Sequence, residues 1–289
     1  MSMSVGSRAR HLVLVLLAVA GLVGGTTPAF AASSQEESSA AAWHDRTYVA
    51  LGDSVPFGFI GSRPDLYPDA DNFVGYPEML ADHLRVRLLN ASCPGETTDT
   101  FIDPAAQSNG CENRLDSDIG YRDVYPLHVD YEGSQLDYAV ETLNDRRVRL
   151  VTLQLGANDL FVCLGTGQCN TPAGLFALGA RVEQNLDLIL GELRHEGAYW
   201  GRIAVVTYYA MDYTDPVGVA AIQTVNAAMI TAAASNGAIV ADGFGAFQSR
   251  ALAAGGSSID AGLVYPGDIH PTAKGHRLLE RAVERAIGH

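Results

Sequence analysis

Four residues of this chain have the types that acyl transfer requires, although long stretches of sequence separate them. They are Ser54, Gly95, Asn158 and His270. A serine hydroxyl attacks a carbonyl carbon once a neighbouring base, such as histidine, takes its proton. Backbone N–H groups at glycine and a side-chain amide stabilise the oxyanion that develops. The set therefore indicates nucleophilic catalysis on an acyl group.

Each of the four residues also has a simpler explanation when it is taken alone. Ser54 follows an aspartate and could only cap a helix. Gly95 follows a proline, as turn glycines do, and Asn158 could only satisfy a loop. His270 could form a local hydrogen bond at a helix start. Three other histidines fall on predicted helices and are expected to face solvent: His83, His195 and His276.

Strands and helices alternate through most of the sequence. Five apolar, β-rich runs predict strands, at residues 46–51, 86–90, 150–155, 203–208 and 238–241. Apolar residues at helical spacing predict helices, at residues 75–83, 135–146, 172–196, 217–235 and 272–287. The strands are continuously apolar, as expected when helices cover both faces. This pattern predicts an α/β fold, a three-layer α/β/α sandwich with a mostly parallel, doubly wound five-stranded sheet.

The predicted strands would bring the four residues together. Ser54 follows the first strand, Gly95 the second and Asn158 the third. The carboxyl ends of parallel strands meet at one edge of a sheet, where ligands bind in open α/β folds. His270 lies just before the last helix. Their joint occurrence, in order and at one edge, favours a shared site.

Three segments between these elements lack a regular pattern. Residues 55–72 and 163–171 are expected to be loops, and residues 96–131 form an irregular insertion. An insertion of that length in a compact domain is usually functional. Residues 57–74 and 97–131 are therefore expected to set the size of the pocket.

The first 31 residues have the pattern of a secretory signal peptide. Arg8, Arg10 and His11 precede an apolar run, residues 12–23, that is shorter than the ~20 residues a membrane span needs. Ala29-Phe30-Ala31 is a small-x-small cleavage site, and the alternative is an uncleaved anchor. We expect residues 32–44 to be a disordered lead-in and residues 45–289 to form a single catalytic domain.

The charge of the chain excludes some partners. The formal net charge is −14, there is no basic stripe, and Lys274 is the only lysine. Such a chain is repelled by nucleic acids and anionic surfaces. We expect no nucleic-acid partner and no stable membrane span.

Four cysteines would remain after export: Cys93, Cys111, Cys163 and Cys169. An even count in an oxidising compartment suggests two disulfides. Three pairings are possible, and proximity favours Cys93–Cys111 with Cys163–Cys169. Zinc is the alternative, but the spacing is not Cys-x-x-Cys and no histidine is close by.

Four sequence blocks resemble the SGNH hydrolase superfamily, in particular the secreted bacterial members of the GDSL esterase/lipase family. The blocks are Gly52-Asp53-Ser54, Gly95, Gly156-x-Asn158-Asp159 and Asp268-x-His270-Pro271. The resemblance implies a flavodoxin-like SGNH hydrolase fold with Ser54 as the nucleophile and His270 as the general base and then acid. It also implies an oxyanion hole made by the N–H groups of Ser54 and Gly95 and the amide of Asn158, without a cofactor or metal.

One position departs from the family pattern. The family commonly has its aspartate three residues before the histidine, where this chain has Gly267. Asp268 lies two residues before His270, so either Asp268 reaches the imidazole or a backbone carbonyl near Gly267 orients it. We favour Asp268, because a carbonyl lacks the charge that stabilises an imidazolium.

Together these features predict a secreted, extracellular serine esterase or lipase that we expect to be monomeric. Its substrates would be lipid or short-to-medium acyl esters, hydrolysed through an acyl-enzyme on Ser54. An O-acetyl esterase acting on polysaccharide is the nearest alternative. A non-catalytic binding protein on the same scaffold is the third, since a fold does not determine a function.

Overall fold

The computed structural model describes residues 46–288, so the predicted signal peptide, lead-in and last residue lie outside the described chain. Within it, five parallel strands form one sheet in the order β2-β1-β3-β4-β5. The strands are β1 (Thr47–Gly52), β2 (Arg87–Asn90), β3 (Val148–Gln154), β4 (Arg202–Val206) and β5 (Ile239–Ala241). The predicted parallel five-stranded sheet is thus confirmed.

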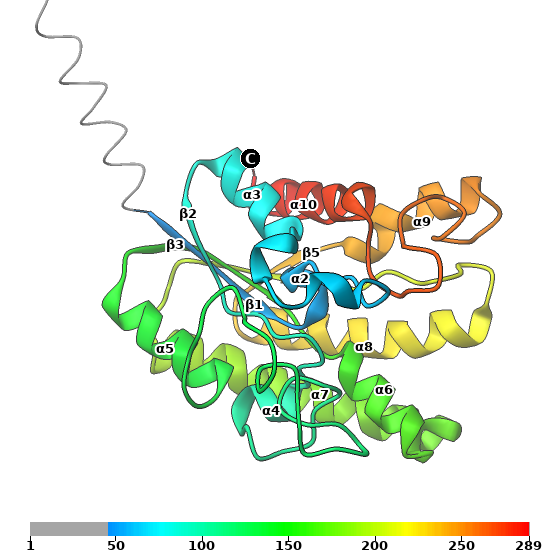
Figure 1. Ribbon diagram of the computed structural model, residues 1–289, viewed down its shortest axis with the longest axis horizontal. Helices are drawn as coiled ribbons and strands as arrows, with labels where there is room; N and C mark the ends of the chain where they lie inside the picture. The colour runs from blue at the N-terminus through cyan, green and yellow to red at the C-terminus, as the bar shows by residue number, and fades with distance from the viewer. Residues whose placement is uncertain (1–45, 289) are drawn as a thin grey trace, which may run out of the picture. The chain divides into compact units, whose positions relative to one another are not determined.

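Helices cover both faces of this sheet (Figure 1). One face carries α3 (Tyr76–Leu84), α9 (Gly243–Ala253) and α10 (Ala273–Ile287). The other carries α5 (Gln135–Asp145), α7 (Pro172–His195) and α8 (Pro216–Ser235). All of β1 is buried between the two layers. The double cover explains why the strands are apolar without alternation.

Among the described helices, α8 is the one long and apolar enough to cross a membrane. Its buried side chains, including Val225, Met229 and Ala233, face the core of the domain. The helix packs against α7, β4 and β5. Packing within the domain buries 33% of the apolar window and accounts for that part of the composition.

The strand order fixes where a ligand can bind. The chain runs from β1 outward to β2 and then crosses to β3 on the other side of β1. A crevice forms at such a switch point, outside the carboxyl ends of the strands. Ser54 lies two residues after the end of β1 there, and the segment from Gly156 follows β3.

The segments expected to lack regular structure contain several short elements. The expected loop at 55–72 holds α2 (Ser54–Phe57), η1 (Pro64–Leu66) and η2 (Ala70–Asn72), and the insertion holds α4 (Thr98–Ile102). The expected loop at 163–171 begins inside α6 (Ala157–Gly165) and ends with η3 (Gln168–Asn170). The helical pattern of α6 is hidden because its first turn carries polar Asn158 and Asp159.

Two disulfides join the cysteines in the pairing that proximity favours. Cys93–Cys111 has a Cα–Cα distance of 5.6 Å and Cys163–Cys169 one of 5.2 Å. The first anchors the irregular insertion beside β1, and the second ties the end of α6 to η3. Each therefore holds a segment that has few backbone ladder bonds of its own.

Candidate active site

Ser54 sits at a tight turn from β1 into α2. Gly52 in this turn has φ 130°, and a Cβ there would lie 2.0 Å from the carbonyl oxygen of Gln154 on β3. Only glycine fits so close a strand contact. Asp53 then caps α2, since its Oδ1 accepts from the N–H of Val55 at 2.9 Å. Strand pairing and helix capping together fix the position of the Ser54 side chain.

His270 lies against Ser54 although the two are far apart in the sequence. Its Nε2 is 2.9 Å from Ser54 Oγ, and both residues are buried. The turn that carries His270 is held by Tyr209, whose hydroxyl donates to the Ile269 carbonyl at 2.6 Å. The His270 carbonyl accepts from the N–H of Tyr265 at 3.1 Å. These hydrogen bonds fix the turn and hold the imidazole against Ser54.

The carboxylate of Asp268 lies on the other side of the imidazole. Its Oδ1 is 2.5 Å from His270 Nδ1, and Oδ2 accepts from the N–H of Ser62 at 2.8 Å. The Asp268 side chain is only 3% exposed. Because a carboxylate only accepts, the hydrogen is on Nδ1, and Nε2 is left to accept from Ser54.

The electrostatics of Asp268 favour its charged form. Burial alone would raise the pKa of this carboxyl, but the hydrogen bond and charge of His270 outweigh it. Backbone N–H groups of Ser62 and Ile269 act in the same direction. The pKa of Asp268 therefore lies well below its usual range, and the group is ionised at neutral pH.

Asn158 is held in one orientation at the start of α6. Its Oδ1 accepts from Asn109 Nδ2 at 2.8 Å, and its Nδ2 donates to Asp53 Oδ2 at 3.3 Å. These two partners identify which amide atom is oxygen and which is nitrogen. One hydrogen of Nδ2 remains for another acceptor. Asn158 lines the same pocket as Ser54 and His270.

Gly95 lies on a loop that is tied to the end of β1. The N–H of Cys93 donates to the Gly52 carbonyl at 3.0 Å, and the Gly95 carbonyl accepts from the N–H of Asn109 at 2.8 Å. Gly95 has φ 90°, and a Cβ there would lie 2.6 Å from Gly110 Cα. It is not among the lining residues of the pocket that contains Ser54. The close backbone approach nevertheless requires glycine at this position.

Sequence reasoning missed the residues that hold these groups in place. Asp53 Oδ2 accepts from the hydroxyl of Tyr208 at 2.5 Å as well as from Asn158. Burial raises the pKa of Asp53 to about 7, against the hydrogen bonds of Tyr208 and Val55, which lower it. Tyr208 in turn is fixed by Asn226 of α8, which binds its N–H and carbonyl. No local pattern could have indicated partners so distant in sequence.

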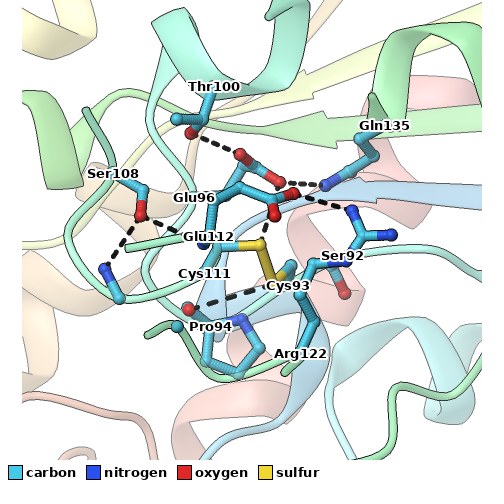
Figure 2. Close-up of a disulfide and its surroundings, with 12 residues drawn as sticks. Ser92, Cys93, Pro94, Glu96, Thr100, Ser108, Cys111, Glu112, Arg122 and Gln135 are labelled. Carbon is cyan, nitrogen blue, oxygen red and sulfur yellow. Dashed lines mark hydrogen bonds and ion pairs between the residues drawn. A yellow bond between two sulfur atoms is a disulfide. The ribbon is translucent and has the colours of Figure 1, made fainter. Parts of the chain in front are cut away.

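A buried carboxyl group lies beside the Cys93–Cys111 disulfide (Figure 2). Thr100 donates to Glu96 Oε1 at 2.5 Å, and Gln135 Nε2 donates to Glu96 Oε2 at 3.0 Å. Gln135 also binds both the N–H and the carbonyl of Gly52. Burial raises the pKa of Glu96 to about 8. Glu96 and Gln135 thus join the segment after Gly95 to the end of β1.

Two groups of described side chains lie close enough to share a metal ion. The first is Cys93, Glu96 and Cys111, but its sulfurs are joined in a disulfide and offer no thiolate. The second is His83 with Glu280 and Glu284, where His83 Nδ1 lies 2.9 Å from a Glu284 oxygen. Neither group includes Ser54 or His270.

Most of the chain matches a known protein family. Residues 50–278 match the model of the GDSL-like lipase/acylhydrolase family. The chain belongs to this family. The match spans the turn at Ser54, the start of α6 and the His270 turn, and it confirms the resemblance drawn from the four sequence blocks. Membership in the GDSL-like family supports hydrolysis of esters as the reaction.

Solved structures share the fold at low sequence identity. LAE5, an alpha/beta hydrolase enzyme from the metagenome of Lake Arreo, is 18% identical, with 85% of this chain and 96% of that chain covered and a TM-score of 0.55. Axe2, an acetylxylan esterase from Geobacillus stearothermophilus, is 16% identical, with 85% and 95% covered and a TM-score of 0.55. No curated protein matches the chain. At this identity the likeness shows the fold alone.

Proposed function

We propose that the protein is a secreted serine esterase that hydrolyses carboxylic esters through an acyl-enzyme on Ser54. The observation that carries the proposal is the hydrogen-bonded chain from Asp268 through His270 to the Ser54 hydroxyl. It pairs a nucleophile with a base and the base with a carboxylate that orients it. Asn158, which has one amide hydrogen left for another acceptor, also lines the pocket beside it.

In the proposed reaction, Ser54 Oγ attacks the ester carbonyl while His270 Nε2 takes its proton. Asp268 stabilises the imidazolium that forms. The N–H groups of Ser54 and Gly95 and the amide of Asn158 stabilise the oxyanion. His270 then gives the proton to the leaving alcohol, and an activated water molecule repeats the sequence to release the acid. No step requires a metal or an organic cofactor.

Secretion is supported by the cysteines. Two disulfides are typical of an oxidising compartment outside the cytoplasm. The predicted signal peptide lies outside the described residues and remains a prediction. The expected monomer and the single catalytic domain at residues 45–289 also remain predictions.

An O-acetyl esterase acting on polysaccharide is the second candidate function. The shared fold with the acetylxylan esterase Axe2 is the observation that favours it. A non-catalytic binding protein is less well supported. Such a protein would have no need for a histidine placed between a serine hydroxyl and a carboxylate.

A labelling experiment tests the proposed function. We expect a fluorophosphonate probe to label the wild-type protein and to leave Ser54→Ala unlabelled. Hydrolysis of p-nitrophenyl butyrate should fall by about 10⁴-fold or more in both Ser54→Ala and His270→Ala, because both residues act in one unit. Ser249, an exposed serine on α9, offers a matched control, and Ser249→Ala should label normally. Folded wild-type protein without labelling would exclude a serine hydrolase.

A further inference from the structure

A pocket of about 280 Å³ opens beside Ser54 between α6, the first half of α8 and the segment that follows β4. Apart from the proposed catalytic groups, its walls are mainly apolar. They include Leu160, Phe161, Met211, Ile222 and Ile269. No described residue of 57–74 or 97–131 lines this pocket, so the expectation that those segments set its size is wrong. We refer to this space as the α6–α8 pocket. Its chemistry suits a hydrocarbon chain, whose burial in such a site is favourable.

The two tyrosine hydroxyls of the α6–α8 pocket already have partners within the protein. The hydroxyl of Tyr208 donates to Asp53, and that of Tyr209 donates to the Ile269 carbonyl. Asp212 accepts from Thr214, Asp215 caps α8 through the N–H of Val217, and both carboxylates are exposed to solvent. A sugar placed against the apolar walls would bury hydroxyl groups with few partners, which is unfavourable.

Building on the proposed esterase function, we propose that the α6–α8 pocket holds the acyl chain of the substrate and selects medium-chain fatty acyl esters. The pocket volume equals that of roughly nine water molecules in the liquid, at about 30 Å³ each. A methylene group is similar in size, so the pocket accommodates an acyl chain of about six to ten carbons. An acetyl group would leave most of it unfilled.

The reaction sequence favours the acyl chain over the alcohol as the occupant. The acyl group stays bonded to Ser54 through both half-reactions, while the alcohol leaves and water enters beside His270. An apolar pocket that holds the acyl chain stabilises the transition states of both steps. The same pocket around the alcohol would be emptied before the second step and would fill with poorly bonded water.

Apolar side chains at the mouth of the pocket limit how long an acyl chain the pocket can select. Phe161, Leu164 and Ile269 are 36%, 43% and 43% exposed. A chain longer than the pocket would reach these partly exposed side chains and then solvent. Each methylene beyond that point buries little further surface. We expect the rate to level off with longer chains instead of rising further.

Two matched substitutions on α8 distinguish the effect of filling the pocket from the effect of changing the helix elsewhere. Ala221 lines the α6–α8 pocket, while its neighbour Ala220 is exposed and faces the groove toward α7. Ala221→Trp should fill the pocket and lower the ratio of octanoyl to acetyl kcat/KM by at least about tenfold. Ala220→Trp adds the same side chain outside the pocket and should keep the wild-type ratio.

The test measures kcat/KM of the protein for two ester series. One varies the acyl chain from acetyl to palmitoyl with p-nitrophenol as the alcohol, and the other varies the alcohol from methyl to octyl with butyrate as the acid. We expect a gain of about threefold to fourfold per added methylene in the acyl series up to octanoyl or decanoyl. The alcohol series should change much less.

Three other outcomes would contradict the acyl-chain proposal or the proposed esterase function. Highest activity on acetyl esters, or on acetylated xylan, would exclude the medium-chain assignment while leaving the serine esterase intact. A gain confined to the alcohol series would place the alcohol in the pocket. Hydrolysis that persists in Ser54→Ala would instead contradict the proposed function. The wild-type series decides the question even if Ala221→Trp fails to fold.

Discussion

Asp268 reaches His270 from only two positions earlier because its carboxylate folds back over its own turn. Its Oδ1 accepts from the backbone N–H of Ile269 and of His270 as well as meeting His270 Nδ1. The N–H of Ser62, from the segment after α2, holds the second oxygen. These contacts hold the carboxylate against the imidazole even though Asp268 lies two residues before His270 and not three, as in the family pattern.

The first prediction concerns this carboxylate. Asp268→Asn should lower kcat toward p-nitrophenyl butyrate by about 10²–10⁴-fold, because an amide neither fixes the required tautomer nor stabilises the imidazolium. KM should change little, since Asp268 does not line the pocket. Steady-state kinetics at neutral pH provide the measurement.

The exposed carboxylate of Asp65 offers the control for Asp268→Asn. Asp65 pairs with Arg63 at the surface, so Asp65→Asn should leave kcat within about twofold. If Asp268→Asn also retained near-normal kcat while His270→Ala abolished activity, a backbone carbonyl would have to orient the imidazole instead.

At the scale of elements, the regular strands and helices could be predicted because each repeats a pattern over many residues. β1 and α7 follow such a pattern, whereas β3 begins two residues before its predicted run, at Val148 and exposed Arg149. His276 was expected to face solvent, which is wrong: it is buried on α10 in the same stripe as Leu279 and Val283. That spacing was readable in the sequence and was missed.

The residues that hold the site in place by hydrogen bonds could not be predicted in the same way. Asn109 and Gln135 act through single hydrogen bonds to Asn158 and Gly52, which lie 49 and 83 positions away. A single contact leaves no periodic signal, and it forms only after the sheet has assembled. Ser54 and His270 were recognisable because a serine and a histidine together suit nucleophilic catalysis. The amide side chains of Asn109 and Gln135 could occur in many environments and indicate no particular reaction.

The second prediction compares the two disulfides. The loop closed by Cys93–Cys111 spans 18 positions and that closed by Cys163–Cys169 spans 6. Replacing the first pair by alanine should lower the free energy of unfolding by about 3 kcal/mol, and replacing the second should lower it less. Only the first should also reduce kcat by roughly tenfold or more, because it anchors the loop that carries Gly95.

Denaturant unfolding and ester kinetics on the two double variants measure both effects. The second pair serves as the control for the loss of a disulfide as such. Equal losses of activity in the two variants would show that the Gly95 loop does not depend on its own crosslink.

At the scale of the whole molecule, the formal charge of −14 overstates the negative charge of the folded chain near neutral pH. Burial raises the pKa of Asp53 and Asp159 to about 7 and that of Glu96 to about 8. Folding therefore favours the protonated form of these groups. Their protons are released as the pH rises, so alkaline conditions oppose folding.

The third prediction isolates this effect with Glu96→Gln, which keeps the shape of the side chain and removes its titration. The folded-state pKa of Glu96, about 8, exceeds its ordinary value of 4.5, so its contribution to stability is full below about pH 4.5. That contribution falls as the pH rises and is lost above about pH 8. Between pH 5 and pH 8 the wild type should lose about 3–4 kcal/mol of unfolding free energy more than the variant, at about 1.4 kcal/mol per pKa unit.

Urea unfolding of both proteins across this pH range measures the difference, and the other carboxyls cancel because the two proteins share them. The neighbouring ion pair of Arg122 and Glu112 is likewise common to both. Parallel curves for wild type and Glu96→Gln would show that Glu96 is already charged in the folded state. The hydrogen bonds that Glu96 accepts from Thr100 and Gln135 would then have to outweigh the effect of its burial on its pKa. A charged carboxylate would in that case connect the Gly95 loop to β1 at neutral pH.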